Sequence, residues 1–202
     1  MRNIEVEKKF ILTAESEQRL LADATFLAEK RISDAYYDTK DFRLSTSDRW
    51  LRKRDGQWEL KLPIRTGSQD QYGVDQYHEL TDEADIRKAL NVPAKETLAD
   101  DLAAHGYTPF ARYVTVRRKY RKGPFTIDVD ETDFGFREVE VEVMVESEQE
   151  VPEATGRIVT FAREHGLDLA PLYGKTIEYI RRHNPTQYEA LSRAGVLRHS
   201  GK

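Results

Sequence analysis

Acidic and basic residues recur at every second position along the predicted strands of this chain, so each strand carries one charged and one apolar face. The clearest run is Glu138, Glu140 and Glu142, which alternates with valines. Like charges spaced two apart on a strand repel one another, and a row of carboxylates lowers strand propensity. Because several strands accept this cost, we predict that their charged faces meet in the polar lumen of a barrel, with helices covering the apolar faces.

For a single strand of this kind, the solvated outer face of a β-sandwich is the better interpretation. The argument for a lumen rests on repetition, and it has a chemical consequence. Concentrated carboxylates need a cation, or their mutual repulsion raises their pKa values, while concentrated Arg and Lys need an anion. A divalent metal ion together with a polyphosphate meets both needs, because carboxylate and phosphate oxygens are hard ligands and Arg and Lys bind phosphate.

Strands and helices are predicted from hydrophobic period and turn residues. The predicted strands are Ile4–Phe10, Asp34–Thr39, Trp50–Arg54, Trp58–Leu62, Gln76–Leu80, Tyr113–Arg121, Phe125–Asp130 and Phe136–Val145. The predicted helices are Glu15–Leu27, Asp82–Leu90, Thr97–His105, Pro152–His165, Gly174–Arg182 and Pro185–Ala194. Strands in hairpin series with few crossover helices predict an α+β fold with an antiparallel sheet. Residues 67–73 are polar and are predicted to form a mobile loop.

Composition restricts the class of protein. The 202 residues suit one domain, and 32 Lys and Arg against 36 Asp and Glu argue against a nucleic-acid partner. No apolar run is long enough to span a bilayer, and the chain contains no Cys. With no signal-peptide pattern after Met1, we expect a cytoplasmic protein without a membrane partner, either a monomer or a homodimer.

A series of short motifs resembles the CYTH domain of the triphosphate tunnel metalloenzyme superfamily. The opening Glu5-x-Glu7-x-Lys9 is weak alone, but further motifs follow in order: Tyr36-Tyr37-Asp38-Thr39, Trp50-Leu51-Arg52-Lys53-Arg54, Trp58-Glu59-Leu60-Lys61, Glu79-Leu80-Thr81, Val114-Thr115-Val116-Arg117, Asp128-Val129-Asp130, Asp133-Phe134-Gly135, Glu140-Val141-Glu142 and Gly174-Lys175. The resemblance covers one CYTH domain over residues 1–191, and we expect residues 192–202 to be a frayed tail. It implies an eight-stranded antiparallel tunnel with helices outside.

The resemblance also implies roles for individual residues. A catalytic Mg²⁺, or Mn²⁺, would be held by Glu5, Glu7, Asp128, Asp130, Glu140 and Glu142. The substrate would be bound by Lys9, Trp50, Arg52, Arg54, Lys61, Glu79, Arg117 and Lys175, with Glu79 orienting the basic groups. The catalytic residues would be Lys61, Glu140 and Glu142; for Lys61, a lowered pKa with a role in proton transfer and plain phosphate binding are both open.

Within the superfamily the chain looks closest to the thiamine triphosphatases. This resemblance implies a small-molecule substrate, thiamine triphosphate, whose terminal phosphoryl group is hydrolysed to give thiamine diphosphate and phosphate. Trp50 would stack on the thiamine moiety; the alternative is that Trp50 only packs under a neighbouring helix. The same fold could instead serve as an inorganic tripolyphosphatase or a nucleoside triphosphatase. An adenylyl cyclase and a noncatalytic polyphosphate-binding module are further alternatives.

Overall fold

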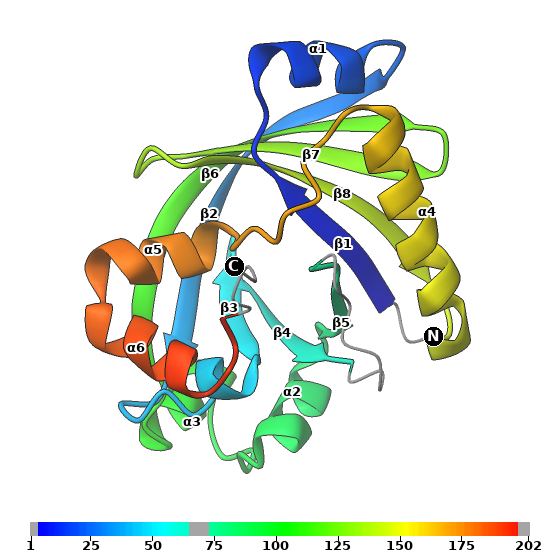
Figure 1. Cartoon of the computed structure of the whole chain (residues 1–202). Coiled ribbons are helices and arrows are strands. Elements are labelled where there is room, and N and C mark those ends of the chain that lie inside the picture. Colours follow the sequence, from blue (N-terminus) through cyan, green and yellow to red (C-terminus); the bar gives the residue numbers. More distant parts are fainter. Residues whose placement is uncertain (1–3, 65–72, 198–202) are drawn as a thin grey trace.

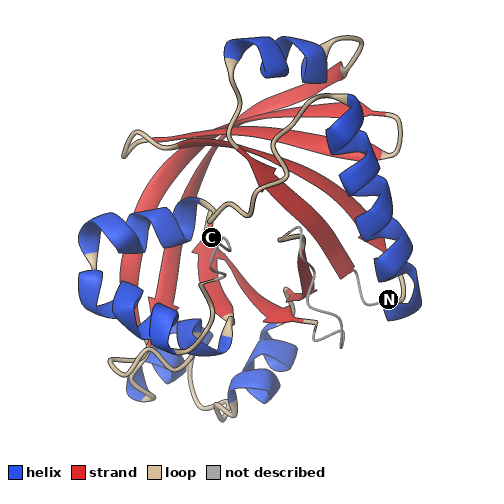
Figure 2. Ribbon diagram, viewed as in Figure 1, coloured by secondary structure: helices blue, strands red, loops and turns tan. Residues whose placement is uncertain are grey.

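The computed structural model describes residues 4–64 and 73–197, and its centre is a closed antiparallel barrel (Figures 1 and 2). Around the barrel the strands follow the order β1-β5-β4-β3-β2-β6-β7-β8. The strands are β1 (Ile4–Phe10), β2 (Thr25–Asp38), β3 (Trp50–Arg54), β4 (Gln57–Pro63), β5 (Asp75–Leu80), β6 (Thr108–Lys122), β7 (Phe125–Thr132) and β8 (Arg137–Val145). The helices are α1 (Ala14–Leu21), α2 (Glu83–Leu90), α3 (Leu98–Ala104), α4 (Val151–Glu164), α5 (Lys175–His183) and α6 (Pro185–Arg193). The predicted eight-stranded antiparallel barrel with surrounding helices is therefore confirmed.

Strand register places the charged faces inside the barrel. Glu7 of β1 lies opposite Glu142 of β8, and Lys9 lies opposite Glu140. Residues opposite one another on paired strands share a face of the sheet. The same holds around the closed sheet, where Arg117 of β6 faces a carboxylate of β7. The alternation seen in the sequence is thus the alternation between lumen and outer surface.

Helices cover the apolar outer faces in two places. Helix α4 packs its Ile158 and Phe161 on the β-branched outer residues of β1, β7 and β8, such as Val6 and Val141 (Figure 1). Helices α2 and α3 enclose a second core in which Ile86 meets residues of β3 and β4. Both cores are buried, and burial of apolar area at about 25 cal/mol per Å² is the main term that stabilises such packing.

Helices α5 and α6 pack on residues that share the face of the lumen. Ile180 of α5 and Leu191 of α6 lie in a buried cluster with Tyr36, Trp50 and Tyr77. Since Tyr36 is the register partner of Arg52, and Trp50 that of Lys61, these aromatic rings belong to the charged side of the strands. The two C-terminal helices therefore border the interior of the barrel as well as its wall.

The predicted helix Glu15–Leu27 is wrong in its second half. Helix α1 ends at Leu21, Asp23 adopts a left-handed conformation (φ 59°), and β2 begins at Thr25. Residues 25–31 instead pair with the far end of β6, where Thr25 faces Arg121. Backbone pairing between β2 and β6 joins segments far apart in the sequence. This pairing outweighs the helical propensity that the local hydrophobic pattern of residues 22–27 indicates.

Of the expected tail, residues 192–202, the structure describes residues 192–197. Ser192 and Arg193 complete α6, and Leu197 is buried against the aromatic cluster beneath that helix. Residues 198–202 lie outside the described residues, as does the predicted loop 67–73 apart from Gly73. Within the described part of the chain, no helix combines the length and apolar character that a bilayer crossing needs.

Asp38 fixes the loop that follows β2, and its removal should destabilise the protein. The carboxylate is buried and accepts hydrogen bonds from the backbone N–H groups of Thr39 (2.7 Å), Leu44 (2.9 Å) and Ser45 (2.9 Å). We expect Asp38→Ala to lower the free energy of unfolding by about 3 kcal/mol, because three buried donors lose a charged acceptor. Urea denaturation measures this loss. Asp41→Ala in the same loop, an exposed control, should cost less than about 1 kcal/mol; equal losses would contradict the anchoring role.

Candidate active site

The lumen is filled by acidic and basic side chains that pair with one another. Strand β1 supplies Glu5, Glu7 and Lys9, and β3 and β4 supply Arg52 and Lys61 across the barrel. Strands β6, β7 and β8 contribute the other charged residues of the lumen, which together with those above form the charged cage of the barrel: Arg117, Lys119, Asp128, Asp130, Glu138, Glu140 and Glu142. Most of these groups are buried or half-buried, so each charge depends on its partners for stabilisation.

One group of charges surrounds Lys61. Its ammonium group contacts a carboxylate oxygen of Glu5 and lies 3.2 Å from Glu79 and 3.7 Å from Glu7. The neighbouring Lys9 donates to Glu7 and to Asp75, both at 2.7 Å. Glu79 thus lies within ion-pair distance of Lys61, and its role in orienting the basic groups stays a prediction.

A second group surrounds Arg117, whose guanidinium spans three carboxylates. It binds Asp130 through two nitrogens, at 2.7 and 2.6 Å, and reaches Asp128 at 2.5 Å and Glu140 at 2.6 Å. Lys119 adds a further contact to Asp128 at 2.9 Å. A planar guanidinium suits such multidentate contacts, which a Lys could not reproduce.

Lys175 enters the same lumen from the start of α5. Its ammonium group lies 2.6 Å from Glu140, 2.8 Å from Glu138 and 2.8 Å from Asp130. Its backbone N–H also donates to Glu138, at 3.1 Å. The preceding Gly174 passes so close to Lys9 that an added Cβ would lie 2.6 Å from Cε of that side chain. The first turn of α5 is therefore fitted against the cage.

The two arginines of β3 have different surroundings. Arg54 forms a bidentate pair with Asp34, at 2.8 and 2.9 Å. Arg52 contacts Glu59 and donates to the Tyr36 hydroxyl at 3.2 Å, and its buried Nε has no hydrogen-bond partner among the described residues. Arg52 therefore keeps donor capacity for a ligand, whereas Arg54 is already occupied by a carboxylate.

Two sets of three carboxylates could each hold a metal ion, since their oxygens lie within 4.8 Å of one another: Glu5, Glu7 and Glu142, and Asp130, Glu138 and Glu140. The second set already contains the ammonium group of Lys175 and contacts Arg117. In the first set, Lys61 contacts Glu5 and Glu7 and Lys9 contacts Glu7, but the one ion pair of Glu142 among the described residues is with the partly exposed Lys119, at 3.4 Å. Carboxylate oxygens are suitable ligands for Mg²⁺ or Mn²⁺. Glu5, Glu7 and Glu142 suit such an ion better than Asp130, Glu138 and Glu140 do.

Within this first set, the pKa values of Glu5 and Glu7 shift in opposite directions. Burial, followed by the charge of Glu7, raises the pKa of Glu5 to about 8. Burial also acts to raise the pKa of Glu7, but Lys61 and Lys9 together lower it to about 2. A cation bound between the two would take the place of the proton on Glu5.

A lowered pKa for Lys61, which the sequence left open, is not what the structure indicates. Burial alone would lower it, but the adjacent Glu5, Glu7 and Glu79 raise the pKa of the ammonium group above its ordinary value. Lys61 therefore stays protonated at neutral pH, which favours phosphate binding over a role as a base.

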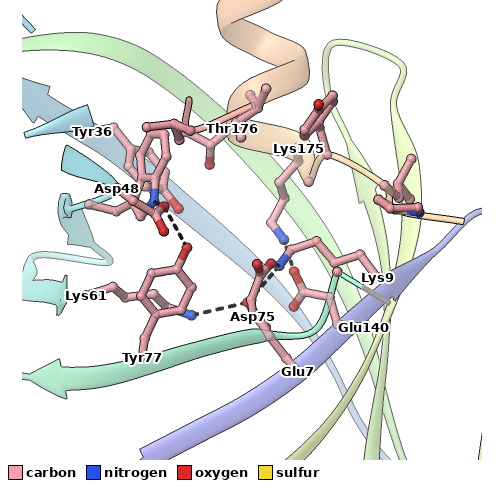
Figure 3. A pocket seen from close by; sticks show the side chains of 18 of the residues that line it. Glu7, Lys9, Tyr36, Asp48, Lys61, Asp75, Tyr77, Glu140, Lys175 and Thr176 are labelled. Carbon is pink, nitrogen blue, oxygen red and sulfur yellow. Dashed lines mark hydrogen bonds and ion pairs between the residues drawn. The ribbon is translucent and has the colours of Figure 1, made fainter. Parts of the chain in front are cut away.

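A cavity opens from the cage toward the C-terminal helices (Figure 3). Lys9, Glu140 and Lys175 gather on one side of it, and Tyr36 and Asp48 on the other. Trp50 also lines the cavity, and its indole N–H donates to Asp48 at 2.9 Å. The two interpretations of Trp50 are thus compatible, because the ring packs near α5 and α6 and still faces the cavity.

The structure divides the predicted site residues into those that line the cavity and those behind them. The lining residues are Glu7, Lys9, Trp50, Arg52, Lys61, Glu140 and Lys175. Of the others, Glu5, Glu79, Arg117 and Asp130 form ion pairs with lining residues, and Glu142 completes a carboxylate set. Arg54 pairs with Asp34, and Asp128 pairs with Arg117, so these two lie one step further from the cavity. The role of each remains a prediction.

Sequence reasoning did not assign Glu138, Asp34, Asp75 and Tyr77 to the site. Glu138 stands in the same charged row as Glu140, so its position in the alternation was a signal that could have found it. Asp75 and Tyr77 likewise precede Glu79 at intervals of two on β5. Asp34 became recognisable only through its pairing with Arg54 on another strand.

Known proteins of similar sequence or structure are consistent with the fold described above. A family model described as the CYTH domain matches residues 3–170. Thiamine-triphosphatase of Homo sapiens is 34% identical over 212 residues, which cover 93% of this chain and 89% of that protein. Thiamine-triphosphatase of Macaca fascicularis is 34% identical over 209 residues, with the same coverage of 93% and 89%. Among solved structures, the PH1819 protein from Pyrococcus horikoshii OT3 shares the fold with a TM-score of 0.57 at 23% identity, covering 81% of this chain and 91% of that one.

The contact between Gly174 and Lys9 yields a matched pair of variants. Gly174 has φ −69°, which suits alanine, so any effect of Gly174→Ala comes from the added Cβ displacing Lys9. We expect binding of inorganic tripolyphosphate, measured by calorimetry, to weaken roughly tenfold. Gly156→Ala in α4 meets nothing within 4 Å and should leave binding intact while stabilising the fold by about 0.5–1 kcal/mol. Unchanged binding in Gly174→Ala would contradict a close fit at this point.

The raised pKa of Glu5 predicts how stability depends on pH in the presence of EDTA. Between its ordinary value of 4.5 and about 8, the folded protein keeps a proton on Glu5 that the unfolded chain has lost. Stability from this group is therefore present below pH 4.5 and is lost as the pH rises through about 8. Thermal unfolding between pH 5 and 8.5 should show a falling Tm. Glu5→Gln should flatten this fall, and an identical slope in both proteins would refute the assignment.

Proposed function

The chain belongs to the CYTH domain family, and from this premise we propose that it hydrolyses the terminal phosphoryl group of thiamine triphosphate in a metal-dependent reaction. The observation that carries the proposal is a cavity whose lining combines buried cations with an indole ring. The 34% identity to thiamine-triphosphatase of Homo sapiens across 93% of the chain supports the same substrate.

Positive side chains that line the cavity bind the triphosphate. Lys9, Arg52, Lys61 and Lys175 reach the cavity from four different elements of the fold, so they can contact successive phosphoryl groups. Arg117 lies behind them and holds Glu140 and Asp130 in place. In a buried site with few competing waters, such cations stabilise the charge that develops on the departing diphosphate.

The metal ion, Mg²⁺ or Mn²⁺, is assigned to Glu5, Glu7 and Glu142. When bound, it supplies charge neutralisation and Lewis-acid polarisation at the phosphoryl oxygens. Two observations support the assignment: these oxygens lie within 4.8 Å of one another, and repulsion between Glu5 and Glu7 contributes to the raised pKa of Glu5. Asp128, Asp130 and Glu140 also contact Arg or Lys, and Asp128 and Asp130 serve mainly to orient those cations.

The reaction needs no covalent intermediate with the protein. A water molecule attacks the terminal phosphorus, the bond to the bridging oxygen breaks, and thiamine diphosphate and phosphate leave. A carboxylate such as Glu140 can orient the water, while protonated Lys61 and Lys175 contribute positive charge to the phosphates. The chain contains no Cys that could act as a thiolate nucleophile.

The main alternative within the same chemistry is hydrolysis of inorganic tripolyphosphate or a nucleoside triphosphate. The cationic side of the cavity would accept any triphosphate, so the choice depends on the opposite side. There Trp50 and Tyr36 offer aromatic surface that a bare tripolyphosphate cannot use. This contrast favours a substrate with an aromatic headgroup.

Replacing Trp50 tests the headgroup interaction. We expect Trp50→Ala to lower kcat/KM for thiamine triphosphate about thirtyfold, since stacking and cation–π contacts are lost, and to change kcat/KM for tripolyphosphate less than threefold. Trp58→Phe is the control, because Trp58 packs in the outer core under α2 and α3. Equal losses for both substrates in Trp50→Ala would show that the ring has only a packing role.

The substrate class and the metal are tested together by phosphate release. We expect wild-type protein with Mg²⁺ to hydrolyse thiamine triphosphate in preference to tripolyphosphate and ATP, and EDTA to abolish the activity. A preference for tripolyphosphate would replace the proposed substrate while retaining the metal site. Activity that persists in EDTA would contradict the metal assignment.

A further inference from the structure

Asp48 occupies a defined position at the aromatic side of the cavity. It follows the short 3₁₀ turn Ser45–Ser47 and adopts the left-handed conformation (φ 57°, ψ 34°), which Asp and Asn accept more readily than most residues. Its side chain lines the cavity together with Trp50 and Tyr77. Nothing in the family resemblance assigned a role to this residue.

The loop that carries Asp48 is fixed at its other end. Asp38 binds the N–H groups of Leu44 and Ser45, and the Ser45 hydroxyl accepts a hydrogen bond from Gln187 of α6 at 3.0 Å. Ser45 and Gln187 are both buried. A carboxylate on a loop held in this way is placed before any ligand arrives, which is a requirement for selective recognition.

One carboxylate oxygen of Asp48 connects two aromatic residues from separate strands. Oδ1 accepts from the indole N–H of Trp50 on β3 and from the hydroxyl of Tyr77 on β5, both at 2.9 Å. Strand β4 lies between those strands in the barrel. Figure 3 shows the Asp48 carboxylate and the Tyr77 hydroxyl turned toward one another on the side opposite Lys9 and Lys175.

Tyr77 remains a donor to this carboxylate. Burial, together with the charges of Asp75 and Asp48, raises the pKa of its hydroxyl well above the ordinary value, so the phenol stays protonated at neutral pH. The indole N–H of Trp50 and the phenol of Tyr77 are both neutral donors, so these two hydrogen bonds position the Asp48 carboxylate without themselves neutralising it. The Lys61 ammonium lies over the ring of Tyr77, 5.6 Å from its centroid.

An aromatic wall by itself does not distinguish a charged ring from a neutral one. Adenine and a thiazolium both stack on an indole, although a cationic ring gains an additional cation–π term. A carboxylate beside that wall adds a preference that depends on charge, since it attracts a cationic headgroup and repels a free phosphate end.

We propose that Asp48 is the specificity-determining residue that makes this cavity prefer a triphosphate with a cationic aromatic headgroup over one with a neutral headgroup or none. The inference rests on the proposed function and deepens it. Trp50 supplies the surface for stacking, and Asp48 supplies the charge and fixes the orientation of the ring. The phosphate side of the cavity is then free to bind any triphosphate, and discrimination takes place at the other side.

Asp48→Asn isolates the charge. Asparagine accepts the left-handed conformation, and its amide oxygen can still accept both hydrogen bonds, so the rings stay in place. We expect KM for thiamine triphosphate to rise about tenfold with kcat within twofold, because the contact is made equally before and during the reaction. KM for tripolyphosphate should stay constant or fall.

Asp55→Asn is the matched control. Asp55 is also left-handed (φ 47°), and its carboxylate accepts a hydrogen bond from the Ser33 N–H at 2.8 Å, but it lies in the β3–β4 turn and does not line the cavity. Its substitution should change neither KM. The Tm values of both variants should be compared, because a folding defect lowers Tm whereas a loss of substrate discrimination does not.

A further measurement needs no variant. ATP carries an aromatic but neutral headgroup, so the KM of the wild-type protein for ATP should lie near that for tripolyphosphate and well above that for thiamine triphosphate.

The outcomes separate this inference from the proposed function. A wild-type preference for thiamine triphosphate that survives Asp48→Asn overturns the inference alone, and so does a KM for ATP as low as that for thiamine triphosphate. A wild-type protein without any preference for thiamine triphosphate over tripolyphosphate overturns the proposed function, and the inference with it.

Discussion

The pairing of opposite charges inside a closed barrel is the interaction on which the rest of this structure depends. Strands with a row of carboxylates are costly in isolation, and unpaired charges cannot remain buried. The barrel solves both problems by bringing acidic strands β7 and β8 against basic residues of β6 and α5, and by bringing Lys61 of β4 against carboxylates of β1 and β5. Because the charged faces turn inward, the apolar faces turn outward, and α2, α3 and α4 are needed to cover them.

These internal ion pairs are consistent with the proposal that the site binds two ligands of opposite sign, a metal ion and a triphosphate. Lys175 and Arg117 are held by carboxylates, and Lys61 lies between Glu5 and Glu79. A cation that binds the acidic groups weakens their hold on the basic ones, and a polyphosphate compensates the basic groups in turn. Metal and triphosphate are thus expected to favour each other's binding, since either one alone leaves charges of the opposite sign without a partner.

The cavity joins two kinds of recognition that have separate structural origins. Its phosphate side is built on barrel strands, where register fixes side chains such as Lys9 and Lys61. Its aromatic side combines a strand residue, Trp50, with a loop residue, Asp48, and borders the C-terminal helices. Contacts on rigid strands suit the reacting phosphates, where positional error is most costly. Contacts from a loop and helices are those that can vary without altering the barrel.

The sequence by itself determined the alternation of charge and hydrophobicity, and this alternation predicted the strands, the polar lumen and most of the charged site. It did so because the period of two in a strand is a local property that reads directly from neighbouring residues. The sequence could not determine that Thr25 leaves the helical pattern to pair with Arg121, or that Asp48 reaches both Trp50 and Tyr77. Those outcomes depend on contacts between distant segments, whose energies exceed local propensity, and only the tertiary structure decided them.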